Sequence, residues 1–238
     1  MIGIWSMSAS PLVAEAIGCA GYDFVVLDME HAPNDVPAML ALLQAVAGTP
    51  TAPLVRLPWN DAVTVKQVLD IGANAVMFPY VQTVEEAQQA VAATRYPPDG
   101  IRGVAGMSRA TRFAGVHDYF AKAAAELCVV VQIETIEAVS RIGEIADVSG
   151  VDSIFIGPSD LSASMGLVGK VDHPDVQAAL ADAASACRAA GKPCGILASG
   201  AARAADYFGY GYDWVAAGSD LGLMMGAARA DVRKLRQR

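Results

Sequence analysis

The sequence predicts an α/β fold of the (βα)8 barrel class, and three observations support this prediction. Short apolar runs alternate strictly with helix-length amphipathic segments from one end of the chain to the other. The apolar runs are continuous, as expected of parallel strands that are buried on both faces. There are eight of them, the number that closes a parallel barrel. A doubly wound open sheet is the alternative, but no Gly-rich dinucleotide fingerprint follows any predicted strand.

The elements can be placed from apolar periodicity and from capping signals such as Pro11, Asn60 and Asp61. Strands are expected at residues 2–5, 24–28, 53–56, 75–78, 128–133, 153–156, 193–197 and 214–217. Helices are expected at residues 10–19, 36–47, 61–71, 84–94, 136–145, 176–190, 201–208 and 221–236. The whole chain, residues 1–238, is predicted to be one barrel domain. The longest irregular segment, residues 96–117, is either functional or an interface arm.

A weak internal repeat precedes the even-numbered strands. A Gly stands two residues before an Asp or Asn at Gly21 and Asp23, Gly72 and Asn74, Gly150 and Asp152, and Gly211 and Asp213. Gene duplication would produce this pattern, but so would shared turn chemistry. Gly ends a helix in the left-handed conformation, and Asp or Asn closes the turn that follows.

Composition excludes several classes of function. A net charge of -8 and a pI near 4.8 argue against nucleic acid or an anionic membrane as partner, and favour small metabolites. Four widely spaced cysteines indicate reduced thiols and no zinc site. The first basic residue is Arg56, so a signal peptide is not expected, and prolines and glycines interrupt the uncharged residues 36–55. We therefore expect a cytoplasmic protein with no membrane span.

The strand at residues 128–133 leads into polar groups that a core would normally exclude. Side chains alternate along a strand, so Gln132 and Glu134 point the same way. Burying a carboxylate costs several kcal/mol unless it is paired, and the partner expected inside a closed barrel is a cation. Glu134 is therefore a candidate metal ligand. The alternative is a carboxylate just past the strand end, either solvated or capping the next helix.

In a (βα)8 barrel the active site lies at the carboxyl ends of the strands, and polar residues gather there. Singly, Asp160 could be a helix cap, His31 a turn residue and Arg56 a surface charge. Together these residues converge on one rim, which unrelated caps need not do. Glu134 and Asp160, from adjacent strands, form an oxygen-rich pair suited to Mg²⁺, Mn²⁺ or Co²⁺.

Six motifs occur in order along nearly the whole chain: Gly3-Ile-Trp5, Asp28-Met-Glu30-His31-Ala-Pro-Asn34, Val55-Arg56, Tyr96-Pro-Pro-Asp-Gly-Ile-Arg102-Gly-Val, Gln132-Ile-Glu134 and Phe155-Ile-Gly-Pro-Ser-Asp160-Leu-Ser. In these motifs the sequence resembles the class II, metal-dependent pyruvate aldolases that cleave 4-hydroxy-2-oxo acids such as 4-hydroxy-2-oxoheptanedioate. The resemblance implies a TIM barrel, a divalent metal, pyruvate and an aldehyde as small-molecule partners, and a hexamer built from dimers.

The resemblance also implies a role for each rim residue. Glu134 and Asp160 would bind the metal, and Gln132 beside them would hold pyruvate or a water. Arg56 would contact the C2 oxygen of pyruvate, where negative charge develops as the enolate forms. His31 would be the general base, oriented by Asp70. The remaining substrate contacts would come from the backbone amides of Ser159 and Asp160 and from Trp5 and Leu197.

Two departures from the family pattern concern the barrel. Met29 replaces a Gly that is frequent between the Asp and Glu of the second motif, so it either narrows the site or packs outward. The sequence starts at the first strand, without the short helix that usually precedes it in the family; if that helix plugs the barrel bottom, we expect other residues to close it here.

The mechanism can be weighed against alternatives from composition. No lysine falls on a predicted strand, which disfavours a Schiff-base aldolase and favours a metal-stabilised enolate. A lyase acting on a CoA thioester and a non-catalytic metabolite-binding barrel are the competing functions. The Arg-bearing segment 96–117 and the apolar residues 221–225 predict contacts with other subunits.

Overall fold

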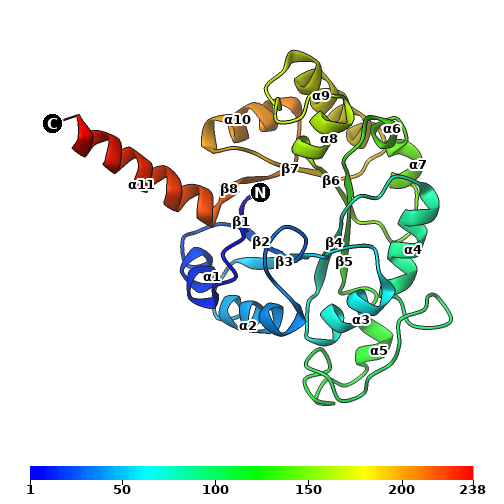
Figure 1. The fold of residues 1–238 in the computed structure, drawn as a ribbon. Helices are drawn as coiled ribbons and strands as arrows, with labels where there is room; N and C mark the ends of the chain where they lie inside the picture. Colours follow the sequence, from blue (N-terminus) through cyan, green and yellow to red (C-terminus); the bar gives the residue numbers. More distant parts are fainter. Residues whose placement is uncertain (238) are drawn as a thin grey trace.

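Eight parallel strands close into a barrel in which each strand pairs with the next and β8 returns to β1 (Figure 1). The structure, a computed structural model, describes residues 1–237, so the last residue of the predicted 1–238 domain lies outside it. The predicted (βα)8 class is confirmed. The strands are β1 (Ile2–Ser6), β2 (Phe24–Asp28), β3 (Ala52–Arg56), β4 (Ala75–Phe78), β5 (Cys128–Ile133), β6 (Ser153–Ile156), β7 (Cys194–Leu197) and β8 (Trp214–Ser219).

The helices follow the predicted alternation with three differences. The helix expected at residues 136–145 is two short helices, because the Ser140 hydroxyl donates to the Glu137 carbonyl at 2.6 Å and competes with the helical ladder. The helix directly after β6, at residues 158–164, was not predicted, and neither was the short helix at residues 119–122. The helices are α1 (Pro11–Gly18), α2 (Val36–Val46), α3 (Ala62–Asp70), α4 (Val84–Thr94), α5 (Tyr119–Lys122), α6 (Ile136–Val139), α7 (Ile142–Ala146), α8 (Pro158–Ser164), α9 (Pro174–Ala189), α10 (Ala201–Tyr210) and α11 (Asp220–Arg236).

The repeat before the even-numbered strands is built from one kind of turn. All four glycines of the repeat have positive φ, between 93° and 101°. The carboxylates of Asp23, Asp152 and Asp213 each accept a backbone N–H from the neighbouring odd-numbered strand at 2.7 to 2.8 Å. Shared turn chemistry therefore accounts for the repeat.

Aromatic side chains fill the barrel interior. The rings of Trp5, Phe24, Phe155 and Trp214 form a chain of contacts with centroids 5.1 to 5.4 Å apart. The close packing requires Gly3, where a Cβ atom would lie 2.3 Å from the Phe24 ring. Because Phe24 and Trp214 begin their strands, they close the amino-terminal end of the barrel. The site lies at the other end.

The position of Met29 shows whether this residue narrows the site or packs outward. Its side chain is buried in the layer between the strands and the helices, where Leu27 and Met39 also pack. It therefore packs outward and does not narrow the interior.

The irregular segment 96–117 packs at the amino-terminal end of the barrel. Arg109 Nη1 donates to the Ile71 carbonyl at 2.8 Å, and the Ala110 N–H donates to the Asp70 carbonyl at 3.1 Å, both just where α3 ends. Its exposed apolar side chains include Met107 and Phe113. This segment is therefore not a lid over the catalytic end of its own barrel.

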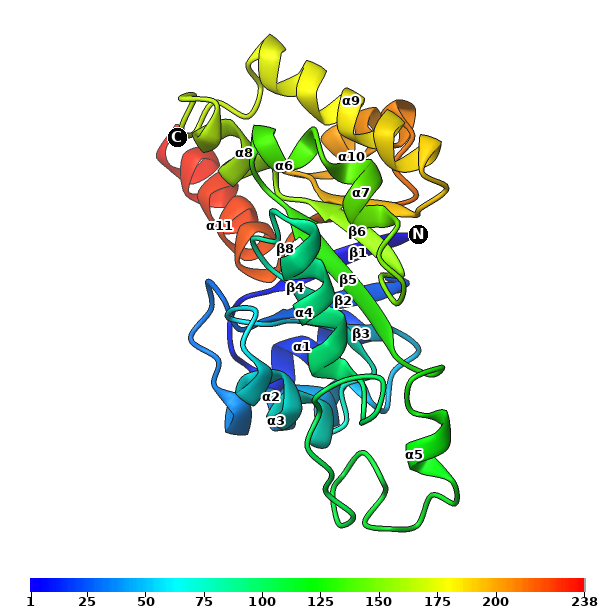
Figure 2. The same ribbon diagram turned by 90° about the vertical axis from the view of Figure 1, so that its right-hand side faces the viewer.

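Helix α11 leaves the barrel and does not lie along its wall (Figures 1 and 2). It contacts mainly β1 and β8. Of the residues of α11, only Asp220 is buried. None of the helices within residues 1–237 combines the length and the apolar character needed to cross a membrane.

Candidate active site

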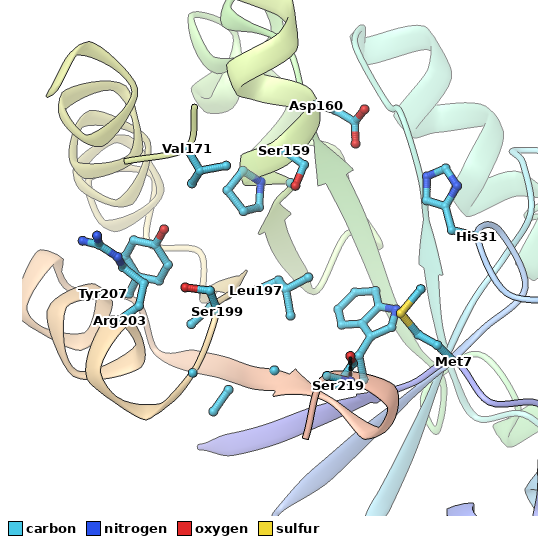
Figure 3. Close-up of a pocket in the computed structure, with 18 of the residues that line it drawn as sticks. Met7, His31, Ser159, Asp160, Val171, Leu197, Ser199, Arg203, Tyr207 and Ser219 are labelled. Carbon is cyan, nitrogen blue, oxygen red and sulfur yellow. Dashed lines mark hydrogen bonds between the residues drawn. The ribbon is translucent and has the colours of Figure 1, made fainter. Parts of the chain in front are cut away.

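A cavity of about 720 Å³ opens at the carboxyl ends of the strands. Figure 3 shows His31 and Asp160 on one side of this cavity and Arg203 and Tyr207 on the other. Seven of the residues predicted for the site line this cavity: Trp5, His31, Arg56, Gln132, Ser159, Asp160 and Leu197.

Glu134 lies directly behind the cavity wall formed by Gly157. A Cβ atom at Gly157 would lie 2.9 Å from Glu134 Cγ and 3.1 Å from Gln132 Nε2. Only a glycine at this place leaves both polar side chains room, and the two face the same way, as the strand alternation predicts.

Arg56 ends β3 and is buried, which excludes the surface-charge interpretation. Its Nε and Nη2 donate to the two oxygens of Asp28 at 2.8 and 2.6 Å, and Nη1 lies 2.7 Å from a Glu30 oxygen. The guanidinium also sits 4.7 Å from the centroid of the Trp5 ring. Burial raises the pKa of Asp28, but the Arg56 guanidinium outweighs burial and leaves the pKa below its ordinary value. The Arg56 guanidinium is therefore held in a fixed position by the carboxylates of Asp28 and Glu30.

Glu134 follows β5 and is only 2% exposed, so it is not a solvated carboxylate. It is not the helix cap either, because the Thr135 hydroxyl accepts the Ala138 N–H at 3.2 Å. Burial raises the pKa of Glu134 to about 8, with further contributions from the nearby charges of Glu30 and Asp160 that Arg56 only partly offsets. The carboxyl group is therefore neutral at pH 7 while the site holds no cation.

Three buried oxygens in this place have no hydrogen-bond partner among the described residues: Glu134 Oε1, Gln132 Oε1 and Glu30 Oε2, of which the last still forms the ion pair with Arg56. Orphaned buried oxygens are rare, and a bound ion is one of the explanations for them. Within residues 1–237 no cluster of three His, Cys, Asp or Glu side chains could hold a metal. A cation here would have two carboxylates, Glu134 and Asp160, which suits hard ions that retain water or substrate ligands. The residues present fit such an ion.

His31 and Asp70 do not meet within the chain, which corrects the predicted pairing. The His31 side chain is 61% exposed, and its Nε2 lies 4.0 Å from Glu30 Oε1. Asp70 instead pairs with Arg102 at 2.9 Å. It is the last residue of α3, and helices of a (βα)8 barrel run antiparallel to the strands, so it lies at the end of the barrel opposite His31.

Sequence reasoning gave no role to Asp28 and Glu30, which together hold Arg56. A signal was available for Asp28, because it ends β2 beside Arg56 at the end of β3 and the two are in register. Burial raises the pKa of Glu30, although the Arg56 charge opposes this. The α8 helix was also missed, although Pro158 at its first position is a start signal.

Residues 1–227 match the HpcH/HpaI aldolase/citrate lyase family. The chain belongs to this family. A 5-keto-4-deoxy-D-glucarate aldolase from Salmonella arizonae is 49% identical over 234 residues, which cover 98% of this chain and 90% of that protein. The crystal structure of an HpcH/HpaI family protein from Burkholderia cenocepacia J2315 is 40% identical, with a TM-score of 0.96 over 99% of this chain and 94% of that one. The citrate synthase SbnG is 28% identical, with a TM-score of 0.87 over 99% and 93% of the chains.

Membership of the HpcH/HpaI family confirms the predicted function class, a class II pyruvate aldolase and hence a carbon–carbon lyase. The citrate synthase SbnG is named for a different reaction. A reaction on other substrates is therefore the alternative function for this fold.

Proposed function

We propose that this family member cleaves a 4-hydroxy-2-oxo acid reversibly into pyruvate and an aldehyde, with Mg²⁺, Mn²⁺ or Co²⁺ bound by Glu134 and Asp160. The observation that carries the proposal is the pair of buried, unpartnered oxygens of Glu134 and Gln132 beside a second acidic group, Asp160. A hydroxylated six-carbon oxo-diacid is the first substrate to test, because the Salmonella relative is named for one.

Arg56 would stabilise the charge that develops in the reaction. As the C3–C4 bond breaks, its electrons move toward C2 and negative charge grows on the C2 oxygen. Asp28 accepts hydrogen bonds from two of the five N–H donors of Arg56, and Nη1 forms an ion pair with Glu30, so each terminal nitrogen keeps a donor for substrate. A charge already fixed in position loses little energy to reorganisation, so it favours the transition state. When bound, the divalent cation supplies Lewis acidity at the same oxygen.

His31 would move the proton. In the cleavage direction it takes the proton of the C4 hydroxyl, the C3–C4 bond breaks, and the aldehyde leaves as the enolate of pyruvate forms. His31 then returns this proton to C3 of the enolate, and pyruvate is released. The exposed position of His31 at the cavity mouth suits exchange of this proton with solvent.

The substrate carboxylate would lie at the start of α8. Ser159 and Asp160 belong to the first turn of this helix and line the cavity. The first-turn N–H groups of a helix have no partners within it and are directed toward an anion. Trp5 and Leu197 would form the apolar floor below.

Exchange of the pyruvate methyl protons tests the proposal against both alternatives. Wild-type protein with Mg²⁺, Mn²⁺ or Co²⁺ in D₂O should replace the methyl protons of pyruvate with deuterium, and chelation should stop the exchange. The Glu134→Gln variant serves as the matched control. A CoA-thioester lyase or a non-catalytic barrel would show no metal-dependent exchange with pyruvate alone. Full activity of a demonstrably metal-free sample would remove the metal from the proposal.

Assembly into a homo-oligomer, expected to be a hexamer, is part of the proposal. Helix α11 projects from the barrel with exposed apolar side chains, among them Met224, Met225, Val232 and Leu235. Exposed apolar surface of this extent normally marks an interface, here with a second copy of the chain. Light scattering should find several subunits. Met224→Ser with Val232→Ser should reduce the assembly, whereas Val168→Ser, an exposed control outside α11, should not.

The cytoplasmic location stays a prediction. It is consistent with Cys19, Cys128, Cys187 and Cys194, all of which are free thiols in the structure.

A further inference from the structure

The barrel closes at an irregular seam between β1 and β8. Gly3 is in register with Ala216 but Trp5 with Ser219, so β8 carries one more residue than β1 over this interval. Gly218 lies within it, with a φ of 123° that side chains rarely tolerate. Such bulges occur at barrel rims and beside active sites, where they redirect side chains.

A buried carboxylate, Asp220, spans the seam. Its Oδ1 accepts the Met7 N–H at 2.9 Å, and its Oδ2 accepts the Ser8 N–H at 3.0 Å. The Ser6 hydroxyl lies 3.4 Å from Oδ2, and the Leu221 N–H donates to Oδ1 at 2.7 Å. No cationic side chain within residues 1–237 forms an ion pair with it. Asp220 is thus held by donors from the loop after β1 and from its own helix.

Residues on both sides of this link line the catalytic cavity. Trp5 and Met7 contribute from the β1 side, and Ser219, Gly222 and Leu223 from the start of α11. Figure 3 places Met7 and Ser219 across the cavity from Ser159 and Asp160. If pyruvate occupies the side of Asp160, the rest of the substrate must lie toward another wall, and the seam provides one.

We propose that Asp220 is a positioning residue that holds Met7 and the first turn of α11 as the wall against which the aldehyde fragment packs. The proposal rests on the proposed function, because it assumes that pyruvate lies against Gln132 and Asp160. The wall offers a thioether, the exposed face of Leu223 and the backbone of Gly222, which suit the carbon chain of an aldehyde. Asp220 itself does not line the cavity, so it acts through Met7.

The test separates the two halves of the reaction in the assembled, metal-loaded protein. Asp220→Asn places an amide NH₂ against one of the backbone N–H donors and loses an acceptor. We expect the KM for the aldehyde to rise about tenfold, the effect of one lost charge-assisted hydrogen bond, while pyruvate methyl exchange changes less than about twofold. The aldehyde is the one that the wild type uses fastest among glycolaldehyde, glyceraldehyde, succinic semialdehyde and the three-carbon hydroxylated aldehyde acid that the proposed oxo-diacid would release. Asp182→Asn, at an exposed position of α9 outside both the cavity and the proposed interface, is the matched control.

Met7→Ala keeps the inference testable if the Asp220 variant fails to fold. It should raise the aldehyde KM in the same way, and the double variant should be no more than about twofold worse than either single one, because both act on one wall. An unchanged aldehyde KM in Met7→Ala, effects that multiply, or a parallel loss of exchange and addition in Asp220→Asn would each overturn the inference. Absence of exchange in the wild type would instead refute the proposed function.

Discussion

Replacing Glu134 by Gln should stabilise the metal-free protein at neutral and alkaline pH. The buried carboxyl has a pKa of about 8 in the folded chain against an ordinary value of 4.5. The folded state holds this proton more tightly than the unfolded chain. The stability that the protonated Glu134 provides is therefore complete below pH 4.5 and is lost as the pH rises through 8. Glutamine has the same shape but does not titrate.

The expected magnitude follows from the same two values. Each tenfold difference in proton affinity corresponds to about 1.4 kcal/mol, so the full effect is on the order of 5 kcal/mol above pH 8 and is absent below about pH 4. We expect the unfolding free energy of Glu134→Gln to exceed that of the wild type by at least about 2 kcal/mol at pH 9. The two proteins should converge at pH 4.5. Urea unfolding with a chelator present, at pH 4.5, 7 and 9, measures this difference.

A divalent ion should make the wild type more stable relative to the Glu134→Gln variant. A cation at about 100 times its dissociation constant stabilises the wild type by about 2.7 kcal/mol and should leave the Gln variant nearly unchanged. Parallel pH profiles of the two proteins would show that Glu134 is not the titrating group. Equal stabilisation of both by the metal would show that Glu134 is not a ligand.

Three further outcomes can be measured on the assembled protein. His31→Ala should lower turnover by ~10²–10⁴-fold, the range for one general base, with pyruvate binding largely kept; an unchanged methyl exchange rate would remove His31 from the mechanism. Arg56→Lys should lower turnover by more than about tenfold despite the retained charge, because a lysine cannot engage Asp28 and Glu30 and still offer two donors; wild-type rates would contradict this geometry. Borohydride with pyruvate should leave the protein mass unchanged, since Lys66, Lys122, Lys170, Lys192 and Lys234 all lie outside the strands, and a pyruvate-dependent mass increase would indicate an imine.

Patterns of neighbouring residues in the sequence were enough to predict the barrel and to place the site at the carboxyl ends of its strands. Apolar runs and turn residues such as Gly21 and Gly150 depend only on near neighbours, so the eight strands could be placed within a few residues. The rim residues followed, because parallel strands put their carboxyl ends together. Helix ends were less certain, since the bond from Ser140 to a nearby carbonyl competes with a helix whose apolar pattern is intact.

The tertiary structure alone decided which groups are partners. Asp28 and Glu30 hold Arg56 because the register of β2 and β3 sets them side by side, and Asp70 meets Arg102 because α3 ends at the opposite end of the barrel. The raised pKa of Glu134 depends on burial and on charges from Glu30 and Asp160, which are distant along the chain. The start of α11 is likewise joined to the loop after β1, because Asp220 accepts the N–H groups of Met7 and Ser8. Each of these contacts joins residues that the sequence separates, and their distances depend on strand register and helix direction.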